Sequence, residues 1–140
     1  MIEKSGLVLG KQLNIPQTLE EKRKLLVVDD DNEIQKILSR KLALMGYDVT
    51  LAGNGLEAST LFVTGSYDLV VTDFEMPLMN GSELSRIVKE KSPNTPVIVI
   101  TGCCDNVMWE QMDKSCLDAI ILKPFRLKEM EGTVRRLLGN

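Results

Sequence analysis

Short apolar runs alternate along this chain with segments in which apolar residues recur at every third or fourth position. The runs have the length of strands and are rich in β-branched residues, which is typical of strands buried on both faces. They lie at residues 25–28, 49–51, 69–71, 97–100 and 119–122. The pattern therefore predicts five buried strands.

The intervening segments have the periodicity of amphipathic helices. The longest apolar stripe stops before Gly46, as expected of a helix that ends at a glycine, and consists of Ile34, Ile37, Leu38, Leu42 and Met45. A second stripe follows the turn and N-cap sequence Asn80-Gly81-Ser82 and consists of Leu84, Ile87 and Val88. The last stripe consists of Leu127, Met130, Val134, Leu137 and Leu138. Weaker helical patterns cover residues 55–64 and 106–116.

A strand followed by a helix, repeated five times, predicts an α/β fold: an open, doubly wound sheet of five parallel strands with helices on both faces. The 140 residues are enough for one domain with a single core. Residues 1–23 mix glycine, proline and charged residues without sustained periodicity. We therefore expect an N-terminal arm or linker at residues 1–23 and the folded domain at residues 24–140.

Composition narrows the possible functions. The formal net charge of -3 and the pI near 5.1 indicate no basic surface for nucleic acid or anionic lipid. There is no apolar stretch of membrane-spanning length and no apolar core of a signal peptide. Three cysteines, Cys103, Cys104 and Cys116, lack the spacing of a disulfide framework or a zinc site. We expect a soluble protein of the reducing cytoplasm that binds neither nucleic acid directly nor membrane.

The chain contains no histidine, which excludes catalysis by Ser-His-Asp or Cys-His pairs and metal sites built on imidazole. Carboxylates, lysines and hydroxyls must carry any reaction. In a doubly wound sheet, ligands bind outside the carboxyl ends of the strands. The polar residues that follow the apolar runs are Asp29, Asp30, Asp31, Asp73, Thr101 and Lys123.

Carboxylates gathered at one sheet edge repel one another and call for a cation, and an all-oxygen cluster suits Mg²⁺. With Lys123 and Thr101 nearby, such a site fits phosphoryl transfer to or from a carboxylate. Each residue also has a structural interpretation. Asp31 precedes a helix and is expected to be its N-cap, and Lys123-Pro124, taken alone, is the exit of a strand. The adjacent pair Asp29-Asp30 is harder to explain by structure alone, because like charges repel.

Five motifs, in order and at family-like spacing, resemble the receiver domain of two-component response regulators. They are Val27-Val28-Asp29-Asp30-Asp31, Asp73-Phe74-Glu75-Met76-Pro77, Leu78-Met79-Asn80-Gly81, Thr101-Gly102 and Lys123-Pro124. The resemblance covers the chain from about residue 24 to its C-terminus. It implies a flavodoxin-like sheet of strand order 2-1-3-4-5, with the ligand site between strands one and three.

The resemblance also implies roles for single residues. Asp73 would take a phosphoryl group from a phosphohistidine of a sensor kinase or a phosphotransfer protein, or from a small-molecule donor. Asp30, Asp73 and the backbone carbonyl of Glu75 would bind Mg²⁺ directly, and Asp29 would act largely through a water. Lys123 would pair with the acyl phosphate, Thr101 would move towards it, and the Lys123-Pro124 peptide would be cis.

In that case the domain is a signalling switch whose chemistry is limited to its own phosphorylation and dephosphorylation, and not a conventional enzyme. Receiver domains commonly form homodimers, so the resemblance also implies a possible homodimer. The downstream partner is not implied by the sequence.

Two positions depart from the usual receiver pattern. Ile120 stands three residues before the lysine, where many receivers have a Tyr or Phe that rotates inward, so the aromatic switch is not expected here. Glu75 places an anion near the entrance of the site, where it could alter the rate of phosphoryl loss. For Cys103-Cys104 a capping or core role is favoured over redox sensing. Trp109 and the methionines beside it, Met108 and Met112, are interpreted as core residues.

Two other functions remain open. A haloacid-dehalogenase-like phosphatase would use Asp29 as its nucleophile, with Asp31, Thr101 and Lys123 in its first three motifs. That reading leaves the motif from Asp73 to Gly81 unexplained and lacks the expected later acidic pair. The other alternative is a receiver-shaped scaffold that is never phosphorylated, against which the full set of acidic, Thr and Lys positions argues.

Overall fold

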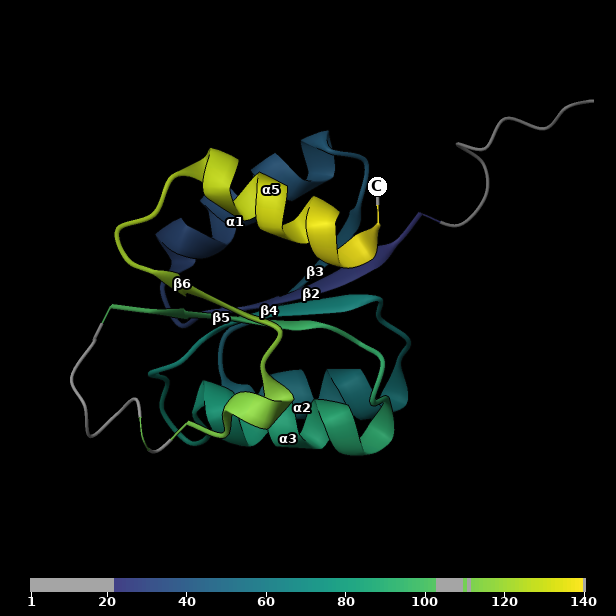
Figure 1. The fold of residues 1–140 in the computed structure, drawn as a ribbon, viewed down its shortest axis with the longest axis vertical. Helices are drawn as coiled ribbons and strands as arrows, with labels where there is room; N and C mark the ends of the chain where they lie inside the picture. The colour runs from purple at the N-terminus through teal and green to yellow at the C-terminus, as the bar shows by residue number, and fades with distance from the viewer. Residues whose placement is uncertain (1–21, 103–109, 111, 140) are drawn as a thin grey trace, which may run out of the picture.

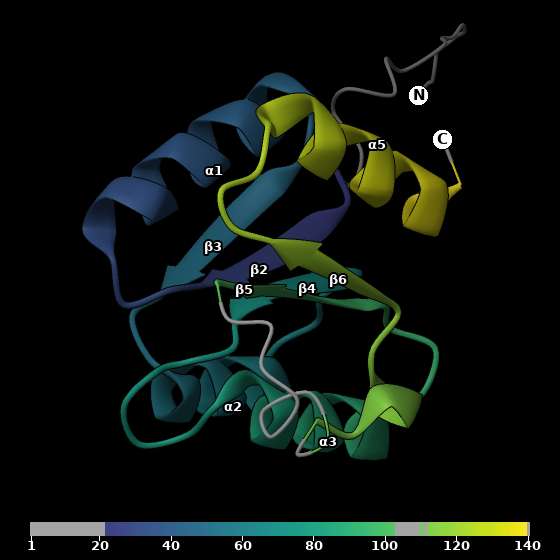
Figure 2. The same cartoon turned by 60° about the vertical axis from the view of Figure 1, so that its left-hand side comes forward.

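A computed structural model describes residues 22–102, 110 and 112–139. Its centre is one sheet of five parallel strands (Figures 1 and 2). The strands are β2 (Lys24–Val28), β3 (Asp48–Ala52), β4 (Leu69–Asp73), β5 (Val97–Thr101) and β6 (Ala119–Leu122). Their order across the sheet is β3-β2-β4-β5-β6, which is 2-1-3-4-5 when the strands are counted along the chain. The predicted strands and their order are confirmed, but the prediction that all five are buried is wrong for the edge strands: Leu51 of β3 and Leu122 of β6 are 37% and 48% exposed, because an edge strand has a neighbour on one side only.

Helices cover both faces of this sheet, as Figure 1 shows. On one face lie α1 (Asn32–Leu44) and α5 (Leu127–Leu138), and on the other lie α2 (Gly55–Thr64) and α3 (Gly81–Lys91). A short 3-10 helix, η2 (Lys114–Cys116), precedes β6. Most of the weak helical pattern predicted for 106–116 falls outside the described residues. Of those described, Glu110 is α-helical, and Lys114–Cys116 form this 3-10 turn.

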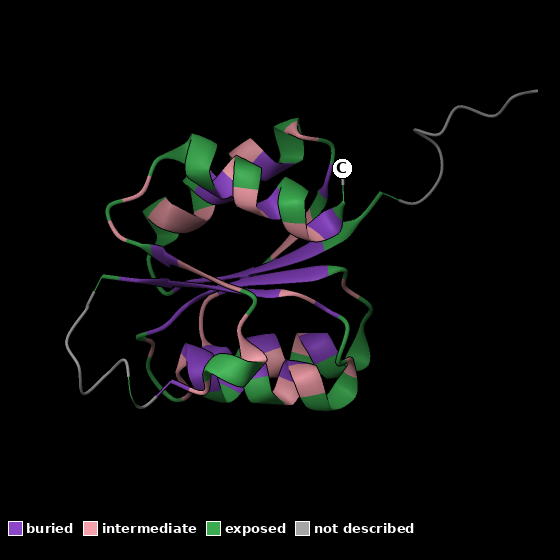
Figure 3. Ribbon diagram, viewed as in Figure 1, coloured by how far each residue is buried: buried purple, intermediate pink, exposed green. Residues whose placement is uncertain are grey.

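The two faces of the sheet bury separate sets of side chains, because successive residues of a strand point to opposite sides. Figure 3 shows that the central strands are buried along most of their length. In β2, Leu25 and Val27 pack on the side of α1 and α5. Leu26 and Val28 pack on the side of α2 and α3. All four are essentially inaccessible to solvent. This burial on both faces is the physical reason why the strands read as continuous apolar runs.

The helix ends follow local sequence rules. The Asp31 carboxylate accepts hydrogen bonds from the backbone N–H of Glu33 and Ile34, so its predicted N-cap role is confirmed. Asn80 caps α3 in a reciprocal capping box with Glu83. Gly46, at φ +100°, follows the end of α1.

Two residues of the predicted apolar stripes are exposed, Ile37 in α1 and Leu127 in α5. Ile37 belongs to the apolar stripe of α1 but is 46% exposed, whereas Leu38 and Leu42 are fully buried. The stripe is wider than the surface that the sheet and α5 can cover, so Ile37 lies at its edge. Leu44 and Leu127 are exposed in the same region.

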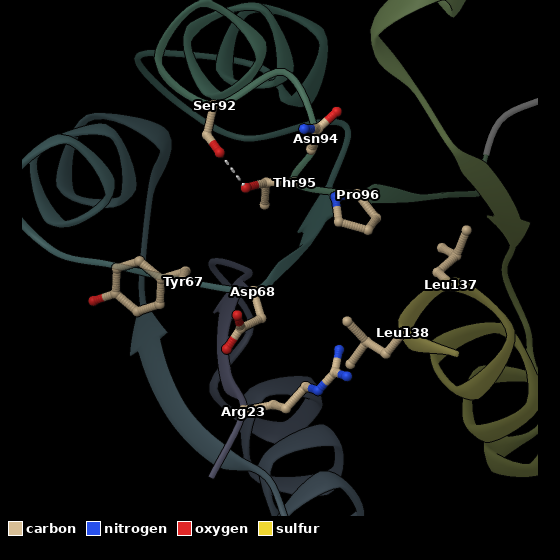
Figure 4. A pocket seen from close by; sticks show the side chains of 9 residues that line it. All are labelled: Arg23, Tyr67, Asp68, Ser92, Asn94, Thr95, Pro96, Leu137 and Leu138. Carbon is tan, nitrogen blue, oxygen red and sulfur yellow. Dashed lines mark hydrogen bonds between the residues drawn. The ribbon is translucent and has the colours of Figure 1, made fainter. Parts of the chain in front are cut away.

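A polar hollow of about 350 Å³ lies where β2, β4 and β5 begin, next to the end of α5 (Figure 4). Its lining is Arg23, Tyr67, Asp68, Ser92, Asn94, Thr95, Pro96, Leu137 and Leu138. A hydrogen bond of 2.7 Å joins the hydroxyls of Ser92 and Thr95 on its rim. Because it lies at the amino ends of the strands, it is at the opposite edge of the sheet from the predicted site.

Candidate functional site

The predicted site residues meet at the carboxyl edge of the sheet. Strand register explains the central contact: β2 and β4 pair Val28 with Thr72, so the next residues, Asp29 and Asp73, lie side by side. Thr101 ends β5, and Lys123 follows β6. The backbone N–H of Lys123 donates to the carbonyl of Thr101 at 2.9 Å, which joins these two strand ends. The parallel topology thus brings together residues that are up to 94 positions apart in the sequence.

Three carboxylates form the centre of the site. Asp29, Asp30 and Asp73 each offer one oxygen, and these oxygens lie within 4.8 Å of one another. Asp29 and Asp73 are buried, at 1% and 6% exposure, while Asp30 is exposed. The cluster thus combines two buried carboxylates with one that is open to solvent.

One oxygen of Asp29 lacks a partner. Oδ1 accepts the backbone N–H of Asp31 at 2.9 Å, whereas Oδ2 is buried and has no hydrogen-bond partner within the described part of the chain. Burial raises the pKa of this carboxyl, and the hydrogen bond from Asp31 and the charge of Lys123 lower it in part. A buried carboxylate oxygen without a hydrogen bond costs free energy unless a cation satisfies it.

Asp73 is the most perturbed of the three carboxyls. Burial, followed by the charge of Asp29, raises the pKa of Asp73 from 3.8 to about 6. Lys123 acts in the opposite direction, since its Nζ lies 3.3 Å from Oδ1 of Asp73. The Lys123 side chain is partly exposed, whereas that of Asp73 is buried.

The loop after β4 is held closely over Asp73. The Phe74 N–H donates to the carbonyl of Ile100 at 2.8 Å, and the Gly81 N–H donates to the carbonyl of Phe74 at 2.8 Å. A Cβ at Gly81 would lie 2.7 Å from the carbonyl oxygen of Asp73, so only glycine fits there. Glu75 in this loop is exposed.

A second glycine, Gly55, makes an equally close contact with this loop. A Cβ at Gly55 would lie 2.5 Å from the carbonyl oxygen of Met79. The first turn of α2 therefore packs directly on the backbone of the loop that follows Asp73. Sequence reasoning missed this residue, because a lone glycine at the start of a helix gives no sign of what lies opposite it.

These residues fit a hard divalent cation. The cluster consists only of oxygen donors, carries several negative charges and includes the unpartnered buried Oδ2 of Asp29. Mg²⁺ binds through one or two protein carboxylates and commonly shares phosphate oxygens. The acidic cluster could therefore bind Mg²⁺, and Lys123 adds a positive charge for an anion beside it.

The chain belongs to the response regulator receiver family. The family model described as response regulator receiver domain matches residues 25–135, nearly the whole of the sheet and its helices. The fold, the edge of the sheet on which the acidic residues meet, and this match identify a receiver domain of a two-component system.

Individual relatives agree with this assignment. The probable transcriptional regulator ycf27 of Cyanidium caldarium is 36% identical over 114 residues, which are 81% of this chain and 45% of that protein. The chain spans about half the length of such transcriptional regulators.

Among solved structures, response regulator TrrA of Thermotoga maritima in complex with Mg²⁺-BeF has a TM-score of 0.75 and 32% identity, covering 83% of this chain and 99% of that one. Chemotaxis protein CheY4 of Vibrio cholerae has a TM-score of 0.77 and 28% identity, covering 84% of this chain and 100% of that one.

Several other expectations can be compared with the structure. The Lys123-Pro124 peptide is cis, as the resemblance implied. Ile120 is partly buried against the core cluster on the side of α2 and α3, so an aliphatic side chain fills that position. Met112 is buried in the same cluster, as predicted. The predictions for Cys103, Cys104, Met108 and Trp109 lie outside the described residues.

No helix in the described ranges combines the length and apolar character needed to span a membrane.

Proposed function

We propose that this domain accepts a phosphoryl group on Asp73 in a Mg²⁺-dependent reaction, with a phosphohistidine of a sensor kinase or phosphotransfer protein as the donor. One observation carries the proposal. A buried carboxylate, Asp73, lies between a second buried carboxylate and a lysine ammonium at the open edge of the sheet. In this reaction an Asp73 oxygen forms a bond to phosphorus and the bond from phosphorus to the donor nitrogen breaks. The donor ring, which carries a proton on its other nitrogen, keeps the electron pair of that bond and leaves as neutral imidazole.

Asp29, Asp30 and Asp73 would hold the metal, together with the backbone carbonyl of Glu75. When bound, Mg²⁺ would supply positive charge that neutralises the carboxylates and the phosphoryl oxygens. The protein's own contribution is to place Asp73 with one face accessible and to keep its surroundings poor in water. Such positioning and electrostatic stabilisation supply most of the catalysis in phosphoryl transfer.

Lys123 and Thr101 would act on the phosphorylated form. The Lys123 ammonium, 3.3 Å from Oδ1 of Asp73, would pair with the acyl phosphate, which carries more negative charge than the carboxylate. The Thr101 hydroxyl, at the end of the next strand, would move towards a phosphoryl oxygen. With Ile120 in place of an aromatic ring, we propose that the signal leaves through movement of the β5 and β6 ends without a ring rotation.

An apolar surface beside Lys123 would receive the phosphodonor protein. Two adjoining hollows share Ile37 and Leu127, and one of them, of about 340 Å³, also includes Lys123, Pro124 and Phe125. Exposed apolar patches of this kind mark protein contacts. Because Lys123 belongs both to this surface and to the site, a helix seated here would bring its phosphohistidine close to Asp73.

The donor surface can be tested separately from the chemistry. We expect Ile37→Asp to slow transfer from a sensor kinase that labels the wild type by about tenfold or more, since a charge in a hot-spot position costs at least 1 to 2 kcal/mol. Labelling by acetyl phosphate should not change. Val63→Asp is the matched control, because Val63 is equally exposed on α2, at the other face of the sheet. Equal kinase transfer in both variants would contradict this placement.

Other features of the whole protein are also proposals. Residues 24–140 would form the receiver unit and residues 1–23 an arm or linker. The relatives include probable transcriptional regulators, so we propose regulation of transcription as one output of the signal. We also propose that the domain can act as a homodimer.

The proposed chemistry is tested with Mg²⁺ and acetyl phosphate, using Asp73→Asn as the matched variant. Labelling of the wild type that requires Mg²⁺ and is lost in Asp73→Asn supports the receiver function. Steady turnover that is lost in Asp29→Asn would instead support a phosphatase with Asp29 as its nucleophile. That alternative also has to explain why the Asp31 carboxylate is occupied in capping α1. Absence of any labelling would support the unphosphorylated scaffold.

A further inference from the structure

Gln35 joins two strand ends at the edge of the site. It lies in the first turn of α1, where its backbone N–H donates to the carbonyl of Asp31 at 3.0 Å. Its side-chain Nε2 donates to the carbonyl of Asp29 at 2.6 Å and to the carbonyl of Ala52 at 3.0 Å. One amide group thus connects the end of β2, the end of β3 and the start of α1.

The chemistry of this contact requires a donor with two hydrogens. Asp29 and Ala52 are both 1% exposed, so neither carbonyl can turn to bulk water without a local opening. Ala52 also accepts the backbone N–H of Asp29 at 3.1 Å. An amide –NH₂ satisfies both carbonyls at once, whereas a carboxylate at the same place would set oxygen against oxygen.

We infer that Gln35 is a positioning residue for the carboxylate cluster, holding the Asp29-Asp30 backbone in the place from which both side chains bind the cation. The inference rests on the proposed Mg²⁺ site. Three contacts fix Asp29: the Asp31 N–H on its carboxylate holds the side chain, while Gln35 on its carbonyl and the bond from its own N–H to the Ala52 carbonyl hold the backbone.

Without the Gln35 contact, charge repulsion would displace the loop at residues 29–31 in the metal-free protein. Asp29, Asp30 and Asp73 repel one another, and the charge of Asp29 contributes to the raised pKa of Asp73. Movement of the loop away from β4 relieves this repulsion and separates the three oxygens. The cluster would then have to be reassembled when the cation binds, which weakens binding.

The experiment compares Gln35→Met and Gln35→Glu with the wild type. Met keeps the length of the side chain and removes both donors, and Glu keeps the shape and replaces the donors by acceptors. Leu38→Ala is the matched control: Leu38 is a buried residue of the same helix whose truncation destabilises α1 without touching the site. Two quantities are measured: amide hydrogen exchange in the metal-free protein, and the Kd for Mg²⁺ by titration calorimetry.

We expect the amides of Asp29 and Asp31 to exchange about tenfold faster in both Gln35 variants and the Kd for Mg²⁺ to rise about tenfold, as for other residues that orient metal ligands. In Leu38→Ala, exchange at these two amides, relative to the rest of β2, and the Kd should remain as in the wild type.

Unchanged exchange at Asp29 and Asp31 in Gln35→Met would overturn the inference. So would a change of the same size in the Leu38→Ala control, since the effect would then be one of general stability. A wild type that binds no Mg²⁺ would overturn the proposed metal site. In that case the metal-free exchange data still decide whether Gln35 holds the loop, so the two failures are distinguishable.

Discussion

Replacement of Asp73 by Asn should stabilise the metal-free domain at neutral pH. In the folded protein the pKa of Asp73 is raised from 3.8 to about 6 by burial and by Asp29. The folded state therefore binds its proton more tightly than the unfolded state does, and ionisation at neutral pH destabilises the fold. The difference of about 2 pH units, at about 1.4 kcal/mol each, corresponds to about 3 kcal/mol. Because Asn is also polar and must be buried, we expect Asp73→Asn to raise the free energy of unfolding by about 1 to 3 kcal/mol at pH 7.

The pH dependence of this stability gain shows whether it comes from the ionisation of Asp73. For a carboxyl with a raised pKa, the destabilisation is absent below pH 3.8, grows between pH 3.8 and about 6, and is constant above that range. The free energy of unfolding is measured by urea titration and circular dichroism at several pH values from 4.5 to 8, with a chelator present. The gain of Asp73→Asn over the wild type should shrink steadily as the pH falls from 6 towards 4.5.

Asp113→Asn is the control for a general effect of removing negative charge. Hydrogen bonds from Ser115 lower the pKa of Asp113, so its ionised form is favoured by folding and its removal should bring no gain at pH 7. If Asp73→Asn were no more stable than the wild type at pH 7, or its gain were the same at pH 4.5 and 7, the electrostatic reasoning would be wrong.

Three further predictions concern the loop that follows β4, the first with Gly132→Ala as its control. Gly55→Ala should lower the free energy of unfolding by about 1 to 3 kcal/mol in urea titrations, because its Cβ would lie 2.5 Å from the Met79 carbonyl oxygen. Gly132→Ala in α5, where a Cβ meets nothing within 4 Å, should instead raise it by about 0.5 to 1 kcal/mol; equal effects would refute the contact. Leu78→Asn should raise Tm slightly, since an exposed leucine at φ +76° is strained by about 1 kcal/mol and asparagine tolerates this conformation; a lower Tm would contradict the strain. Glu75→Asn should change the half-life of phosphorylated Asp73, measured by phosphate release, because it removes an anion at the entrance; an unchanged decay rate would exclude this role.

Much of the site could be predicted because strand ends carry its residues. Asp29, Asp30, Asp73, Thr101 and Lys123 each follow an apolar run, and parallel strands bring such positions to one edge. Their convergence is confirmed for the three carboxylates and for Lys123 by the distances between side-chain atoms. Their binding and catalytic roles stay predictions.

Other features could not be predicted from periodicity. Ile37 has the spacing of a core residue, yet it is exposed, because how much of a helix face is covered depends on the neighbouring elements. Gln35 reads as an ordinary polar residue of a helix surface. Its contacts are with the carbonyls of Asp29 and Ala52, and the pairing of β2 with β3 creates that arrangement.

The sequence by itself determined the elements and their type. Alternating apolar patterns, cap residues such as Asp31 and Asn80, and the lack of histidine depend on local chemistry, so they can be read without coordinates. Properties that depend on the distance between residues and on their burial were decided only by the tertiary structure. The raised pKa of Asp73, the unpartnered oxygen of Asp29 and the closeness of Gly55 to Met79 all arise between segments far apart in the chain. Free energies of burial and charge are set by three-dimensional surroundings, and these exist only once β2 and β4 lie side by side.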